Sequence, residues 1–193
     1  IIGIIMYFLL EPDAKPVKAA ETGDHVSANK QAWEGVVRAL KDKRIWLVSF
    51  NIFFVYSVYC GLTYFIPFLQ EAYALPAALI GAYGIINQYG LKMLGGPVGG
   101  IVSDKVLHSA TKYLQILFVI VAASLAIFSF LPHQNMSIIL GMTITLCISA
   151  CVFSMRAIFF APMDEVGVPR EITGSAMSIG SFIGYLPGAF MYA

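Results

Sequence analysis

Two basic residues lie inside long apolar runs, where a charge is costly. The chain has 12 Lys and Arg residues, and all except Lys92 and Arg156 lie in the polar segments between these runs. A Lys or Arg at the centre of a bilayer costs at least about 2.5–3.5 kcal/mol, so such residues normally face a protein interior or a water-filled cavity. A cation in such a cavity can bind an anion, and Arg can hold a carboxylate or phosphate through two hydrogen bonds.

Lys92 lies near the middle of its apolar run, with polar neighbours one turn earlier. Gln88 precedes it by four residues on the same helical face, and Asn87 is adjacent to Gln88. We expect these three residues to lie in a substrate pathway or to take part in coupling. The alternatives are an ion pair with a carboxylate elsewhere in the protein, or a side chain that reaches the interface, which is difficult from mid-span.

Arg156 lies about one turn from the end of its run, four residues before Phe160. Its long side chain could reach the interface from there. Thr145 and Ser149 share a helical face with Arg156, and this polar stripe predicts the lining of a cavity. The sequence leaves a functional role and interfacial anchoring equally open for Arg156.

Aromatic and hydroxyl side chains lie on one face of two other runs. Tyr56 and Tyr59 share a face with Thr63, and Ser178 shares one with Tyr185. These residue types suit the binding of a sugar or an anion. Hydrogen bonds between helices explain them equally well.

The sequence has none of the motifs that carry enzyme chemistry. It contains no phosphate-binding loop, no metal-ligand spacing and no nucleophile with a base beside it. The three cysteines lie in apolar runs and fit small buried residues. We therefore expect no enzyme activity, no catalytic residue, no metal site and no cofactor. We also expect no nucleic-acid partner.

Composition and run length indicate a protein that crosses a bilayer several times. The chain is 59% hydrophobic and 12% charged, with a mean hydropathy of +0.78. A soluble domain of this size needs more polar surface. Five apolar runs are long enough for a helix that spans about 30 Å of hydrocarbon. They are residues 45–69, 77–103, 113–131, 137–160 and 172–193.

The basic residues alternate between the connecting segments. Residues 11–44, 104–112 and 161–171 contain Lys or Arg, whereas residues 70–76 and 132–136 contain none. Because cytoplasmic loops are enriched in Lys and Arg, the three basic segments are expected in the cytoplasm. No Asp or Glu lies deep in any of the five runs, so a proton-carrying carboxylate would belong to another part of the protein.

The long basic segment has two predicted parts. Residues 11–29 are polar and resemble a disordered linker. From residue 30 to 44, apolar residues repeat at helical spacing opposite charged ones, which predicts an amphipathic helix in the membrane interface. A short soluble helix is the alternative. Residues 1–10 are too short to span a bilayer and fit the end of a transmembrane helix, so we expect the chain to be a piece of a longer protein.

Glycines at four-residue spacing predict close helix packing. Gly180, Gly184 and Gly188 follow this spacing in the last run, and Gly96 and Gly100 follow it in the second. Small residues at this spacing let neighbouring backbones approach closely. Glycine also permits rocking, so a role in gating is the alternative.

One loop resembles a family signature. Gly100, Asp104 and Lys105 form G-x-x-x-D-K at the end of the second run, which resembles the loop between helices eight and nine of the major facilitator superfamily. Residues 160–170, followed by Thr-Gly-Ser-Ala at 173–176, look like bacterial members of this family that move sugars or organic anions. The resemblance extends along essentially the whole chain.

The resemblance implies an all-α polytopic membrane helical bundle, the C-terminal half of such a transporter. Residues 1–10 would be the tail of helix six, residues 11–44 the central cytoplasmic loop, and residues 45–193 helices seven to eleven. The N-terminal half would be missing. The family implies secondary active transport by alternating access, as a symporter or antiporter in a bacterial inner membrane. The substrate would be a small polar organic solute, possibly an anionic sugar or carboxylate, and the coupling ion a proton or sodium. The alternative is a non-transporting membrane receptor or scaffold of the same fold.

The resemblance also implies two sites. Family members bind substrate at the midplane, and the helices that carry Lys92, Tyr56, Tyr59, Arg156 and Ser178 would contribute to that cavity. Gly100, Asp104 and Lys105 would form a conformational latch, in which the Asp docks at a helix N-terminus of the other half. The sequence departs from the family pattern after Lys105, where residues 106–108 lack the usual Gly and paired basic residues.

Overall fold

A computed structural model describes residues 28–131 and 137–192, and these residues form helices without strands. The helices at the beginning of the chain are α2 (Ala28–Lys41), α3 (Lys43–Gly61), the 3-10 turn η1 (Leu62–Tyr64) and α4 (Phe65–Tyr73). They are followed by α5 (Ala77–Ile85), the π-helical turn η2 (Ile86–Leu91), α6 (Lys92–Ile101) and a second π-helical turn, η3 (Val102–Leu107). The remainder comprises α7 (Ala110–Phe130), α8 (Ile138–Ile158), α9 (Pro162–Glu165), the 3-10 turn η5 (Arg170–Ile172), α10 (Thr173–Tyr185) and α11 (Pro187–Phe190). The chain divides into compact units of residues 1–31 and 32–193, and the packing described below is that of the second unit.

Three described helical segments are long and apolar enough to cross a membrane. They are Lys43–Tyr73, Ala110–Phe130 and Ile138–Ile158, with mean hydropathies of 1.7, 2.3 and 2.2. They match three of the five predicted spans. The predicted span over residues 77–103 is part of a continuous helical rod over residues 77–107, whose middle carries polar residues. The fifth is divided into α10 and α11, where Pro187 begins a new helix because proline cannot donate a backbone hydrogen bond.

The amphipathic segment predicted from residue 30 forms helix α2. Ala39 is buried in the core, whereas Trp33 and Leu40 are 69% and 44% exposed. The indole Nε1 of Trp46 donates a 2.8 Å hydrogen bond to the Leu40 carbonyl, which fixes the corner between α2 and α3. The Asp42 carboxylate accepts from the backbone N–H of Arg44 and caps α3. Exposed apolar residues on α2 suit contact with lipid, which stays a prediction.

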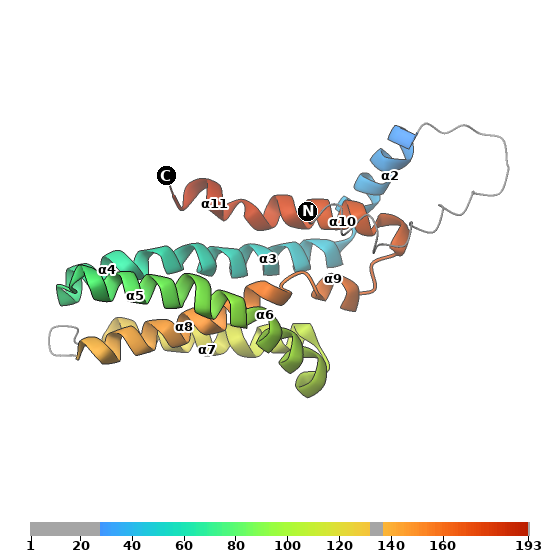
Figure 1. The fold of residues 1–193 in the computed structure, drawn as a ribbon. Helices are drawn as coiled ribbons and strands as arrows, with labels where there is room; N and C mark the ends of the chain where they lie inside the picture. Colours follow the sequence, from blue (N-terminus) through green and yellow to red (C-terminus); the bar gives the residue numbers. More distant parts are fainter. Residues whose placement is uncertain (1–27, 132–136, 193) are drawn as a thin grey trace, which may run out of the picture. The chain divides into compact units, whose positions relative to one another are not determined.

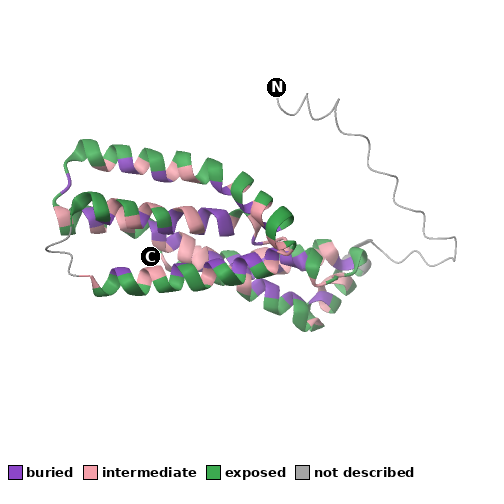
Figure 2. Cartoon of the chain, turned by 90° about the horizontal axis from the view of Figure 1, so that it is seen from below, coloured by how far each residue is buried: buried purple, intermediate pink, exposed green. Residues whose placement is uncertain are grey.

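The long helices pack in pairs, α3 against α10 and α6 against α8 (Figure 1). Buried residues lie mainly on the faces that the helices turn toward one another, and the outer faces are coloured as exposed (Figure 2). Many of the exposed residues are large and apolar, as expected for helices that face lipid or another part of the protein.

Glycine makes both helix pairs possible. A Cβ atom added at Gly95 would lie 2.9 Å from the backbone carbonyl carbon of Phe153, and one at Gly99 would lie 2.9 Å from the carbonyl oxygen of Ser154. In the other pair, a Cβ at Gly184 would lie 2.3 Å from the Ile52 side chain. The backbones of α6 and α8 therefore touch.

The sequence predicted the close packing of α6 at Gly96 and Gly100, and the structure shows it at another pair of glycines. A Cβ at Gly96 or Gly100 would meet no described atom within 4 Å, so Gly95 and Gly99 form the close contact instead. Both pairs have the same spacing, and only the orientation of the helix distinguishes them. The prediction for α10 is confirmed at Gly180 and Gly184, which face α3.

Hydrogen bonds join the predicted cytoplasmic segments at one end of the bundle. Arg44 Nη1, at the start of α3, donates to the Val166 carbonyl at 3.2 Å. Residues 109–111, at the start of α7, donate to Glu165. The segments that the charge pattern assigns to one side of the membrane are therefore in contact.

We expect Gly95→Ala to destabilise the full-length protein, because the new methyl group would push α6 away from the backbone of Phe153. Overpacking of this kind costs about 1–3 kcal/mol. Thermal unfolding of purified protein in detergent measures the effect. Gly81→Ala on α5 is the control, since a Cβ there meets nothing within 4 Å. Equal melting temperatures for both variants would contradict the backbone contact.

Candidate functional site

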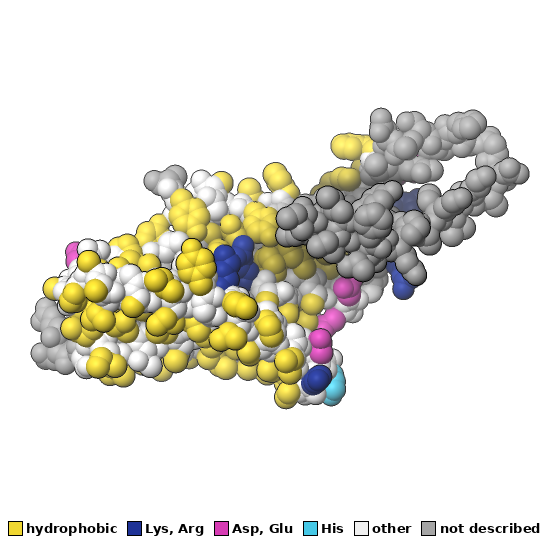
Figure 3. All heavy atoms as spheres, in the orientation of Figure 1, with side chains coloured by type: hydrophobic (Ala, Val, Ile, Leu, Met, Phe, Trp, Pro, Cys, Tyr) yellow, Lys and Arg dark blue, Asp and Glu magenta, His cyan; other side chains and the backbone are white. Residues whose placement is uncertain are grey.

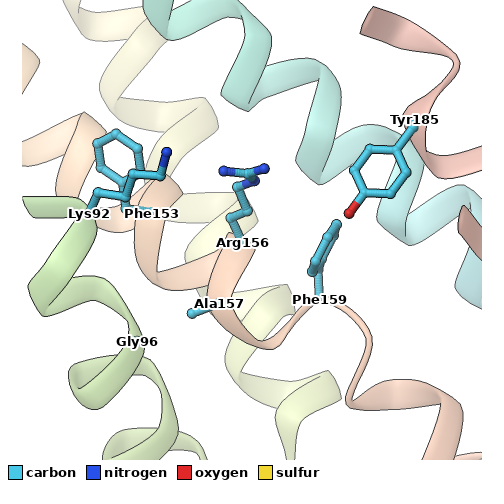
Figure 4. Close-up of a pocket in the computed structure, with 7 residues that line it drawn as sticks. All are labelled: Lys92, Gly96, Phe153, Arg156, Ala157, Phe159 and Tyr185. Atoms are coloured by element: carbon cyan, nitrogen blue, oxygen red, sulfur yellow. The ribbon is translucent and has the colours of Figure 1, made fainter. Parts of the chain in front are cut away.

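The two basic residues of the apolar runs line one surface pocket. The pocket has a volume of about 270 Å³ and is open to the surface. Figure 4 shows Lys92 reaching it from α6 and Arg156 from α8. The other lining residues are mainly aromatic or small, namely Gly96, Phe153, Ala157, Phe159 and Tyr185.

The close contact of α6 with α8 explains why these residues meet. Gly95 lies against the backbone of Phe153. Lys92 precedes Gly95 by three residues, and Arg156 follows Phe153 by three, so both lie within one turn of the contact. The packing of the two helices thus brings together cations that are 64 residues apart in the sequence.

Arg156 is held by aromatic rings. Its guanidinium carbon lies 3.9 Å from the ring centroid of Tyr59 and 5.8 Å from that of Tyr56. The Tyr56 ring packs edge-on against Tyr185 at a centroid distance of 4.7 Å. Stacking of this kind stabilises a half-buried cation and restricts its orientation while leaving its N–H groups free to donate.

The pocket is positively charged because Lys92 and Arg156 line it and no carboxylate does. Among the described residues, neither Lys92 nor Arg156 forms an ion pair or a side-chain hydrogen bond. In the space-filling view, a patch of Lys and Arg side chains lies within a largely hydrophobic surface (Figure 3). Two uncompensated cations beside aromatic rings can bind an anion that also has an apolar face.

Of the other predicted site residues, two contact Arg156, and the remaining three do not line this pocket. Tyr56 and Tyr59 contact Arg156. Asn87 is only 1% exposed and Gln88 is half-buried, and neither lines the pocket. Ser178 lies in another, apolar pocket of about 320 Å³ beside Trp46 and Phe182, and its hydroxyl donates to the Gly174 carbonyl at 2.9 Å.

The polar stripe predicted on α8 does not line a cavity along its whole length. Arg156 faces the pocket, but Thr145 and Ser149 are fully buried. The prediction was wrong for these two residues because η2 and the neighbouring helices α3 and α4 pack against α8.

Sequence reasoning placed Tyr185 on a face that suits sugar or anion binding, but it did not assign Phe153 or Phe159 to the site. Tyr185 carried a signal, since it shares a face with other polar residues of the last run. Phe153 and Phe159 carried none, because Phe in an apolar run fits contact with lipid equally well.

The predicted latch residues lie at the end of the same rod that the charge pattern predicts to be cytoplasmic. Asp104 and Lys105 are exposed, and neither forms an ion pair with a described residue. Asp104, Asp164 and His108 line a pocket of about 370 Å³ there. Among the residues with described positions, no three His, Cys, Asp or Glu side chains are arranged to hold a metal ion. The latch itself stays a prediction.

Glu165 caps the N-terminus of α7 from a distant part of the sequence. Its carboxylate accepts hydrogen bonds from the Ser109 hydroxyl and the Thr111 backbone N–H, both at 3.1 Å, and from the Ala110 backbone N–H. Partial burial raises the pKa of this carboxyl, but the hydrogen bonds from Thr111, Ala110 and Ser109 outweigh burial and hold the pKa below its usual value. The helix dipole favours the same charged form.

Comparison with known proteins gives a family match along the chain. The model of the Major Facilitator Superfamily matches residues 1–192. Inner membrane protein YihN of Escherichia coli K12 is 51% identical over 192 residues, which are 100% of this chain and 45% of that protein. Inner membrane protein YqcE of the same organism is 26% identical over 195 residues, which are 100% of this chain and 44% of that protein.

The chain thus spans less than half the length of these curated relatives. No solved structure matches it significantly.

We expect Glu165→Gln to lower the stability of the full-length protein at neutral pH, because the charged carboxylate favours the N-terminus of α7. The loss is about 0.3–1 kcal/mol, typical of an exposed carboxylate at a helix N-terminus. Since the pKa is lowered in the folded state, the wild-type advantage is present above the ordinary carboxyl pKa and disappears as pH falls through the lowered one. Thermal unfolding between neutral and acidic pH measures this. An advantage that does not change with pH would contradict the electrostatic cap.

Proposed function

The chain belongs to the Major Facilitator Superfamily of membrane transporters, and we propose that it forms half of a secondary transporter for a small organic anion. It is a multi-pass protein of a bacterial inner membrane. The proposed substrate is a sugar acid or another carboxylate. It moves by alternating access, in which the two halves of the complete protein expose one site to each side in turn.

The convergence of Lys92 and Arg156 on one pocket supports an anionic substrate. A cation inside a bilayer is costly unless a charged partner or water accompanies it. No carboxylate from the described residues compensates these two side chains. A substrate carboxylate can accept two hydrogen bonds from Arg156 and a third from Lys92.

The aromatic surroundings support a substrate with an apolar face. Tyr59 and Tyr56 hold the guanidinium from one side, and Phe159 and Tyr185 line the pocket. Stacked Arg156 retains N–H groups that can reach an anion in the pocket. A sugar acid offers both the carboxylate and an apolar ring face, and it would fit the available volume of about 270 Å³ together with space from the other half.

The energy source in this proposal is an ion gradient. The sequence contains no nucleotide-binding loop, so ATP hydrolysis by the chain is not supported. The protein would act as a symporter or an antiporter, with a proton or sodium as the coupling ion. A receptor of the same fold would bind the anion without moving it across the membrane.

Removal of Lys92 tests the site. In the full-length protein, we expect Lys92→Ala or Arg156→Ala to lower uptake about thirtyfold or more, because the loss of one partner of a charge interaction with the substrate costs about 2 kcal/mol or more. Uptake and counterflow of labelled gluconate, glucuronate and succinate in proteoliposomes measure the effect. Lys112→Ala, which removes an exposed charge outside the pocket, is the control.

The membrane content of each variant is measured in parallel to show that insertion is intact. Wild-type uptake by Lys92→Ala would remove Lys92 from the site. Binding of a labelled anion without any counterflow would favour the receptor.

Substitutions at Tyr59 test the stacking on Arg156. We expect Tyr59→Leu to raise the apparent KM about two- to thirtyfold, the range given by a cation–π contribution of about 0.5–2 kcal/mol. Tyr59→Phe keeps the aromatic ring and should remain close to wild type. The measurement is the concentration dependence of uptake. An equal rise in KM for Phe and Leu would assign the effect to the hydroxyl instead.

A further inference from the structure

The apolar pocket beside Trp46 lies where helix α2 meets helix α10. Val36 and Leu40 line it from α2, Trp46 lines it from α3, and Ser178 and Phe182 line it from α10. Its volume is about 320 Å³, and it opens to the surface, since Phe182 is 74% exposed. None of the described residues that line it is charged. We call this pocket the α2 groove.

Close packing of α2 on α10 forms one end of the groove. A Cβ atom added at Gly35 would lie 3.0 Å from the Ser175 hydroxyl oxygen, so the two helices touch there. Ser175, Ser178 and Phe182 are three and four residues apart and share one face of α10. The groove therefore begins at the contact with α2 and continues along α10, which packs beside α3 (Figure 1).

The predicted topology places the groove at the depth of lipid acyl chains. The charge pattern assigns residues 161–171 to the cytoplasm, and α10 begins at Thr173. Because a helix rises about 1.5 Å per residue, Ser178 and Phe182 lie about 8 and 14 Å further into the membrane. Trp46 lies three residues after the start of α3, at the interface level where Trp is common in membrane proteins.

Exposed basic residues surround the corner between α2 and α3, next to the groove. They are Arg38, Lys41, Lys43 and Arg44. Lys41 directly follows Leu40 of the groove. Lys43 precedes Trp46 by three residues and shares its face of α3. Neither lysine forms an ion pair with a described residue, and the carboxylate between them, Asp42, caps α3.

The other charged residues of this corner are engaged elsewhere or lie on another face. Arg44 Nη1 donates to the Val166 carbonyl at 3.2 Å. Glu34 and Arg38 each lie two residues from Val36, so they lie on the opposite face of α2 from the groove. Among the described residues, the two lysines are therefore the cations placed to bind a phosphate at the mouth of the groove.

We propose that the α2 groove binds an anionic phospholipid of the cytoplasmic leaflet. One acyl chain lies in the groove, and the phosphate binds the ammonium groups of Lys41 and Lys43. A volume of about 320 Å³ is at the lower end for ligand sites, so the groove holds part of one chain. A cluster of four basic residues next to a membrane helix is typical of proteins that recognise anionic lipids.

The charge at the mouth of the groove favours a lipid over another transmembrane helix as the occupant. A phospholipid supplies both an apolar chain for the groove and a phosphate for the two lysines, at the depths where the structure offers their partners. A helix would cover the apolar groove but leave the lysines without an anion. The lipid site is separate from the pocket of Lys92 and Arg156, and it does not depend on the proposed function.

Native mass spectrometry of the purified full-length protein with dioleoylphosphatidylglycerol or dioleoylphosphatidylcholine tests the site. The two lipids have the same chains, and only the first has a net negative charge. We expect wild type to bind phosphatidylglycerol at least about tenfold more tightly, and Lys41→Gln combined with Lys43→Gln to remove most of this difference, because each basic residue contributes about fivefold. Lys112→Gln combined with Arg170→Gln is the matched control, since it removes two exposed charges from other predicted cytoplasmic segments.

Substitutions on α10 test the acyl-chain groove separately from the charges. Ser178→Phe places a ring in the groove at an exposed position, and we expect it to weaken the binding of phosphatidylglycerol about fivefold or more, because the chain loses its contacts with α10. Met177→Phe is the control, since Met177 is also exposed and does not line the groove.

Size-exclusion chromatography and the melting temperature without added lipid show that each variant is folded. Equal affinity of wild type for the two lipids would overturn the proposal, and so would a double lysine variant that binds phosphatidylglycerol like its matched control. Absence of saturable binding by wild type, as expected if another part of the full-length protein fills the groove, would also overturn it. These measurements involve no uptake, so a protein that moves no organic anion would lose the proposed function and keep the lipid site.

Discussion

The contact of α6 with α8 at Gly95 and Gly99 determines the arrangement of the rest of the site. Because neither glycine has a side chain, the backbone of α6 rests on Phe153 and Ser154. This contact places Lys92 and Arg156 at one pocket and encloses Asn87 on the inner side. A pair of larger residues would separate the helices, and the cations would no longer share a pocket. The close packing of α6 against α8 thus determines where the two positive charges lie.

The charge arrangement then restricts the chemistry. A positive pocket within a membrane protein attracts anions more strongly than the same charges would in bulk water, because water screens charges. The rings of Tyr59 and Tyr56 stabilise Arg156 without neutralising it, as a carboxylate would. The pocket thereby keeps its charge available for a ligand. Since relatives have about twice the length of this chain, the opposite wall of the pocket would come from the remaining half.

The sequence was sufficient for the helical membrane fold and for the two cations within apolar runs, because both depend on local composition. It could not show that Lys92 and Arg156 meet, since that depends on the packing of helices far apart in the chain. Four-residue spacing fits Gly95–Gly99 and Gly96–Gly100 equally, so the contacting pair was misidentified. Thr145 and Ser149 shared a face with Arg156, but the helices that pack against α8 are visible only in the folded chain. Glu165 was missed because its partners lie 54 to 56 residues away.

The cap that Glu165 provides for α7 has an evolutionary consequence. The Glu165 carboxylate in one loop accepts hydrogen bonds from hydroxyl and amide groups of the other loop. Arg44 donates a hydrogen bond to the carbonyl of the adjacent Val166. Changes in either loop are then constrained by the other, so related proteins should inherit the two loops together. Chimeras that exchange one loop without the other would lose the matching hydrogen-bond donors and acceptors between the two loops, even where each parental segment folds correctly.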